Sequence, residues 1–172
     1  MTDYCPTLNA RLTILRPLVA HHANALFPIF RDVDLWRYTG REEPKTLTAM
    51  QGRYRRLESR RSPDGKELWL NWAVEQREDG RPVGVVQASV PISRSHADIA
   101  YVLGRAFWGH GLAIDAVNAM LDFLRVTLHV RTARASVDSR NLPSVKLLER
   151  LGFRIDDAID PMSVWFNKLL LN

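Results

Sequence analysis

The amino-acid sequence predicts an α/β fold, with a mixed, mostly antiparallel sheet that has helices on both faces. Two observations lead to this prediction. Strand-like residues 67–76 and 82–90 flank an Asp79-Gly80 pair, which is a common hairpin turn. Residues 97–153 then alternate strand, helix, strand and helix, an order that packs helices against a sheet.

The N-terminal part is expected to form one strand and two helices. Residues 11–18 alternate as in a strand until Pro17. Residues 19–32 have a helical pattern that is expected to end at Pro28, because proline removes a helical N–H donor. Residues 46–61 form the second expected helix. Its apolar stripe consists of Leu47, Met50, Tyr54 and Leu57.

The C-terminal part is expected to form three strands and two helices. In residues 97–104, Ile99, Tyr101 and Leu103 face one way, as in a strand. A helix with a broad buried face follows Gly111. The remaining expected elements are a strand at residues 131–138, a helix at 141–153 that Asn141 or Ser139 could cap, and a strand at 163–171.

Composition indicates a soluble globular protein. The chain has 172 residues, of which 46% are hydrophobic and 25% charged, so one domain over residues 1–172 is expected. No apolar run approaches the ~20 residues that span a bilayer. The single cysteine, Cys5, excludes an internal disulfide and fits a reducing compartment, so a cytoplasmic location without membrane contact is expected.

The basic character of the chain leaves two interpretations open. The formal net charge is +5, and much of the excess lies in residues 53–61. A solvated basic helix face is favoured over a nucleic-acid site, since no nucleic-acid-binding motif accompanies these arginines. Nucleic acid is therefore not an expected partner.

The stretch FWGHGLAIDAV, residues 107–117, places two glycines around a histidine just before a helix. Glycine lets an anion approach the unpaired amides of a helix start, so a phosphate or pyrophosphate is the expected ligand. A Walker A loop would need Lys and Ser or Thr after Gly111. A dinucleotide fingerprint would need a small residue at Ile114 and an acidic residue near position 130. Both motifs fail.

The stretch IAYVLGRAFWGHGLAIDAV resembles motif A of the GNAT superfamily of acyl-CoA-dependent N-acyltransferases. Its last half fits the pyrophosphate loop pattern, although Trp108 stands where the pattern has Arg or Gln. SVDSRNLPSVKLLERLGF is similar to a later motif of the branch containing ribosomal-protein N-terminal acetyltransferases. The resemblance covers nearly the whole chain in order and implies a six- to seven-stranded sheet.

The resemblance implies transfer of an acetyl group from acetyl-CoA to a primary amine, either a protein N-terminus or a small-molecule amine. Val102 and Leu103 would hold the pantetheine and offer a main-chain amide to the thioester oxygen. Asn141 would contact the pantetheine or cap the following helix. The residues expected to cradle the pyrophosphate are Trp108, Gly109, His110, Gly111, Leu112 and Ala113.

The residues expected near the reacting groups allow more than one catalytic assignment. Many superfamily members use a tyrosine as general acid where this chain has Leu148. Ser144 is the nearest hydroxyl that could hydrogen-bond the sulfur, or it could bond within its own helical turn. Asp98 or His96 could accept the amine proton through water, or Asp98 could be an ordinary strand-edge carboxylate.

The acceptor pocket is expected beside Trp36, Arg37 and Tyr38, which could equally be structural. No metal is expected, because His21, His22 and His129 have no partner at metal-ligand spacing. A homodimer is expected from the family alone. An acyl-CoA-binding sensor or pseudoenzyme without turnover is the alternative function, since the usual tyrosine is missing.

Overall fold

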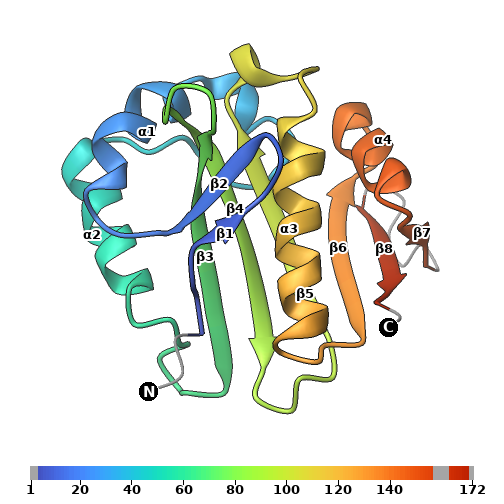
Figure 1. The fold of residues 1–172 in the computed structure, drawn as a ribbon. Helices are drawn as coiled ribbons and strands as arrows, with labels where there is room; N and C mark the ends of the chain where they lie inside the picture. The colour runs from blue at the N-terminus through green and yellow to red at the C-terminus, as the bar shows by residue number, and fades with distance from the viewer. Residues whose placement is uncertain (1–3, 157–162, 171–172) are drawn as a thin grey trace.

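The computed structural model describes residues 4–156 and 163–170, which fold around one sheet (Figure 1). The helical elements are α1 (His22–Phe30), η1 (Val33–Leu35), α2 (Leu47–Leu57), η2 (Arg105–Phe107), α3 (Leu112–Val126) and α4 (Leu142–Arg150). The strands are β1 (Leu8–Asn9), β2 (Thr13–Pro17), β3 (Glu67–Gln76), β4 (Pro82–Pro91), β5 (Ala97–Leu103), β6 (Thr132–Asp138), β7 (Arg154–Ile155) and β8 (Ser163–Leu169).

The described strands form a single sheet in the order β1-β2-β3-β4-β5-β6-β8-β7. Neighbouring strands pair antiparallel except β5 and β6, which are parallel. The predicted mixed, mostly antiparallel sheet is therefore confirmed. The sheet has eight strands rather than six or seven, because the two-residue strands β1 and β7 extend it.

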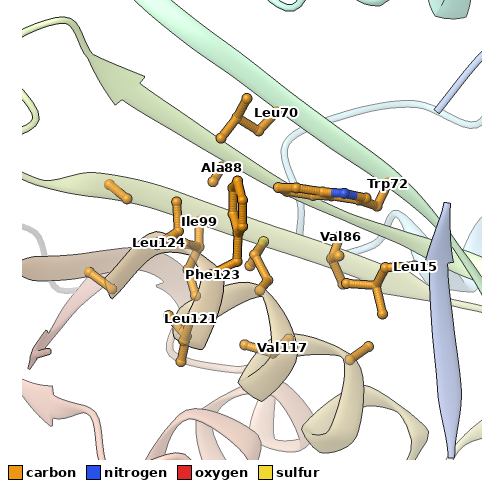
Figure 2. Close-up of a cluster of buried hydrophobic side chains, with 14 of the residues drawn as sticks. Leu15, Leu70, Trp72, Val86, Ala88, Ile99, Val117, Leu121, Phe123 and Leu124 are labelled. Atoms are coloured by element: carbon orange, nitrogen blue, oxygen red, sulfur yellow. The ribbon is translucent and has the colours of Figure 1, made fainter. Parts of the chain in front are cut away.

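One face of the sheet packs against α3 and forms the larger core (Figure 2). Sheet residues such as Leu70, Trp72 and Val86 are fully buried there, opposite Phe123 and Leu124 of α3. The rings of Trp72 and Phe123 meet edge to face, with centroids 5.8 Å apart. This packing accounts for the apolar spacing of α3 in the sequence.

The other face packs against α1 and α2. Met50 and Tyr54 of α2 and Phe30 of α1 are buried with Ala73 of β3, and Leu47 and Leu57 pack at the edge of this cluster. The predicted apolar stripe of α2 is thus confirmed. Helices cover both faces, as the sequence predicted.

The prediction that the first helix ends at Pro28 was wrong by two residues, since α1 continues to Phe30. Pro28 deprives the carbonyl of Asn24 of its helical donor, but both residues are exposed, so water can replace that bond. Burial of Leu26 and Phe30 then keeps the last turn helical. No helix in the described ranges is long and apolar enough to cross a membrane.

Candidate functional site

The central feature of the site is the divergence of β5 from β6. The two parallel strands pair only at Ala97–Ala133 and Asp98–Arg134. β5 remains paired with β4 as far as Leu103. Within the described residues, the edge of β5 beyond Asp98 that faces β6 has no strand partner, so its main-chain groups are accessible to a bound molecule.

A cavity of about 770 Å³ occupies this opening and extends beneath α2. Residues 99–102 of β5 and 135–138 of β6 form one end of its wall, and α2 with the loop before it forms the other. Its volume lies within the range of small-molecule and cofactor sites. Two molecules, one between the strands and one beneath α2, could therefore meet inside it.

The loop from β5 to α3 has two glycines in the left-handed backbone region. Gly109 has φ +80° and Gly111, immediately before α3, has φ +78°. In the part of the chain that the structure describes, the main-chain N–H groups of residues 109–114 have no hydrogen-bond partner. Together with the dipole of α3, these donors favour an anion.

Two contacts hold this loop in place. Trp108 donates its indole N–H to the carbonyl oxygen of Leu103 at 2.8 Å. Asp115, in the first turn of α3, accepts three hydrogen bonds of 2.8–2.9 Å from the amides of Leu12 and Thr13 and the Thr13 hydroxyl. The Asp115 carboxylate is thereby committed to the β1–β2 connection, so the helix amides remain open.

None of the predicted pyrophosphate residues, Trp108 to Ala113, lines the cavity between β5 and α2 in the described part of the chain. His110 and Leu112 border a second cavity of about 540 Å³, together with Arg11 and Arg77. Leu112 is also buried in the core. The main-chain amides of these two residues remain available to an anion site, while the Leu112 side chain packs in the core and the His110 side chain is exposed.

Ser144 of α4 contacts Tyr101 of β5 across the opening. The two hydroxyl oxygens are 2.8 Å apart, and both residues line the cavity. Burial raises the pKa of Tyr101 to about 12, so its hydroxyl keeps its proton at neutral pH. The Ser144 hydroxyl is therefore bound to another element rather than to its own helical turn. Leu148 is fully buried in the core and offers no polar group.

Asn141 caps α4 and also lines the cavity. Its side-chain oxygen accepts a hydrogen bond from the Ser144 amide at 3.3 Å. The predicted role of Asn141 as a helix cap is thus confirmed. Its contact with a cofactor stays a prediction. The cap also fixes where Ser144 lies relative to Tyr101.

Asp98 and His96 lie together but outside the cavity wall. The carboxylate oxygens of Asp98 accept hydrogen bonds of 2.8 and 3.0 Å from Arg134, and His96 Nε2 is 3.6 Å from one of them. Asp98 thus ties β5 to β6 at the last position where the strands pair. Its role as a base, and that of His96, stays a prediction.

The three residues expected beside the acceptor have different environments. Trp36 is buried against Phe30 and also lines the cavity, so it has a structural role and its contact with an acceptor stays a prediction. Tyr38 also lines the cavity. Arg37 is exposed and forms an ion pair of 2.8 Å with Asp34, and it is not part of the cavity wall.

Sequence reasoning missed two features of this site. Tyr101 was expected only to share a strand face with Ile99 and Leu103. Nothing in the strand pattern indicates that Ser144 of α4 lies within hydrogen-bond distance of its hydroxyl. Arg53 and Arg56 were interpreted as a solvated face; both are exposed, as expected, but both also line the cavity. Their helical spacing predicted that they share one side of the helix, but it could not identify the cavity that this side borders.

Comparisons with known proteins bear on this geometry. A family model described as an acetyltransferase (GNAT) domain matches residues 11–154. An uncharacterized N-acetyltransferase, p20, from Bacillus licheniformis is 41% identical over 58 residues, which cover 34% of this chain and 33% of that protein. The chain thus matches about a third of the length of this relative.

Solved structures share the fold. An acetyltransferase of the GNAT family from Bacillus anthracis superposes with a TM-score of 0.80 at 16% identity, covering 95% of this chain and 98% of the other. Spermidine N-acetyltransferase from Vibrio cholerae, solved with CoA and spermine, superposes with a TM-score of 0.75 at 17% identity, covering 92% and 96%.

Proposed function

The chain belongs to the GNAT acetyltransferase family and is an acyltransferase, and on that premise we propose that it transfers the acetyl group of acetyl-CoA to a primary amine. One observation carries the proposal: a single cavity joins the open edge of β5 to the space beneath α2. A donor between the strands and an acceptor beneath α2 would have their reactive groups within one cavity, which promotes direct attack.

The chain offers suitable groups for coenzyme A. The amides of Gly109 to Ala113 would hold the pyrophosphate, because they are unpaired in the described structure and lie at the positive end of α3. The open edge of β5 at Val102 and Leu103, with Asn141 opposite, would hold the pantetheine arm. Acetyl-CoA supplies the activated acetyl group as a thioester.

The residues around the opening could stabilise the charges that develop during transfer. A main-chain amide of Val102 or Leu103 would donate to the thioester oxygen. Ser144 would hold a proton near the sulfur, and Tyr101 would fix the direction of the Ser144 hydroxyl through their 2.8 Å contact. Because Tyr101 stays protonated at neutral pH, its hydroxyl can donate to Ser144 while Ser144 donates elsewhere.

Removal of the proton from the acceptor amine does not require a side chain of the cavity wall as the base. The described carboxylates in its wall are Glu42 and Asp138. Arg140 lowers the pKa of Asp138 to about 2, so Asp138 is a weak base. An α-amine has a pKa of about 8, so part of it is already neutral and water can accept the proton. Asp98 and His96 are the proposed endpoints of such a water path.

The acceptor would lie against Trp36 and Tyr38, with Arg37 at the outer edge of the same loop. A protein N-terminal amine and a small-molecule amine are both consistent with this pocket. Membership of the ribosomal-protein N-terminal acetyltransferase branch, a cytoplasmic location and a homodimer form part of the same proposal.

A thiol-release assay tests the function. The protein is incubated with acetyl-CoA and a panel of amines that includes short peptides, amino acids and polyamines. We expect amine-dependent release of free thiol, with a mass increase of one acetyl group on the accepted amine. Coenzyme A binding without thiol release from any amine would instead support the sensor without turnover.

A further inference from the structure

Three arginines line the acceptor end of the cavity. Arg53 and Arg56 are on α2, and Arg41 is on the loop before it. The helical spacing of three places Arg53 and Arg56 on the same side of α2. Gly40, which has φ +65°, ends the turn at residues 36–40, and Arg41 follows it in the same wall.

No carboxylate neutralises these three arginines within the described residues. The carboxylates in the same wall are already engaged: Glu42 pairs with Lys45 at 3.2 Å, and Asp138 with Arg140 at 2.6 Å. Other arginines of the chain, such as Arg105 and Arg134, do have acidic partners. The acceptor end of the cavity therefore carries uncompensated positive charge.

Arg53 shows the consequence of this arrangement. Although its side chain is exposed to the cavity, the surrounding walls remove part of its water and lower its pKa, and the charges of Arg41 and Arg56 lower it further. A bound anion would relieve this repulsion, and a guanidinium can hold a carboxylate or phosphate through two hydrogen bonds. A polycationic acceptor would be repelled instead.

We propose that the acceptor amine carries an anionic group, a carboxylate or a phosphate, which Arg53, Arg41 and Arg56 bind beneath α2. This inference rests on the acetyl transfer proposed above. The anion would hold the acceptor at that end, with its amine directed toward the opening between β5 and β6. These arginines are then residues that determine acceptor specificity.

Matched acceptors test this proposal. We would measure acetylation of ω-amino acids from β-alanine to 6-aminohexanoate against the corresponding amides, of phosphoethanolamine against ethanolamine, and of spermidine. At least one acid or phosphate should have a kcat/KM about tenfold or more above its uncharged partner. The carboxylate and phosphate pairs identify which anion is preferred. Equal rates within every pair, or preference for spermidine, would overturn the proposal while leaving acetyl transfer intact.

A variant of Arg53 separates acceptor binding from other roles. For Arg53→Gln we expect the KM of the preferred anionic acceptor to rise about tenfold, with the KM for acetyl-CoA and the thermal midpoint unchanged. Arg55→Gln is the control, since Arg55 is exposed on the same helix but does not line the cavity. A rise in the KM for acetyl-CoA instead would place the cofactor phosphates at Arg53 and refute the inference. Thiol release from no amine at all would refute the proposed function itself.

Discussion

Replacing Gly109 by alanine isolates the anion site from the stability of the fold. Gly109 has φ +80°, and a Cβ added there would meet no atom within 4 Å. The methyl group therefore creates no internal collision. The cost to folding is the cost of an alanine in the left-handed region, about 1 kcal/mol. For a chain of this size, that cost corresponds to a thermal midpoint lowered by about 2–4 °C.

Gly80 provides a control with matched backbone geometry. It has φ +70° in the turn between β3 and β4, and a Cβ added there would likewise meet no atom within 4 Å. Gly80→Ala should therefore lower the thermal midpoint by a similar amount. Only Gly109→Ala places a methyl group beside the amides proposed to hold pyrophosphate.

Coenzyme A affinity then distinguishes the two variants. We expect Gly109→Ala to raise the dissociation constant of coenzyme A about tenfold, or about 1.4 kcal/mol, in isothermal titration calorimetry. Gly80→Ala should leave this constant unchanged. If both variants lose stability equally and Gly109→Ala binds coenzyme A as tightly as the wild type, pyrophosphate does not approach Gly109 and the proposed cradle is wrong.

Three further predictions follow from individual contacts. Asp115→Ala leaves three donors without their acceptor and should lower the free energy of unfolding by about 3 kcal/mol or more, measured by urea titration. As a control, Asp122→Ala on the exposed side of α3 should change the free energy of unfolding by less than about 0.5 kcal/mol. Ser144→Ala should lower kcat with little change in coenzyme A affinity. Tyr101→Phe should also lower kcat, but by a smaller factor. An unchanged kcat in both variants would exclude this pair from the mechanism. Burial lowers the pKa of His22 below 6.5, so the unfolded chain binds the proton more readily than the folded chain. The free energy of unfolding should therefore fall as the pH decreases from about 6.5 toward the folded-state pKa. Urea titrations of wild type and His22→Gln that show the same pH dependence would contradict this assignment.

Local signals in the sequence predicted most of the architecture. The hairpin at Gly80 depends on the turn residues themselves, and that glycine has the positive φ expected there. The left-handed Gly152 after α4 is a similar case. Such features depend on a residue and its immediate neighbours, so they can be inferred without knowing the tertiary structure. The end of α1 was placed too early, because burial of Phe30 outweighed the effect of Pro28.

The sites where separate elements meet were harder to predict. Asn141 was correctly considered as a cap, since capping is a local property. The contact between Tyr101 and Ser144 joins positions 43 residues apart, and it depends on how far β5 separates from β6. Asp98 was considered as a base, yet Arg134 occupies both of its oxygens because those residues face each other across the parallel pair.

The sequence by itself determined the order of helices and strands, the two glycines before α3 and the apolar faces that make the core, because periodicity and backbone preference are properties of nearby residues. The tertiary structure decided where β5 and β6 separate, which hydroxyl meets Ser144, and that the exposed Arg53 and Arg56 line a cavity. These outcomes depend on the packing of elements distant in the chain. The basic helix α2, whose sequence predicts a solvated face, therefore also forms one wall of the proposed acceptor site.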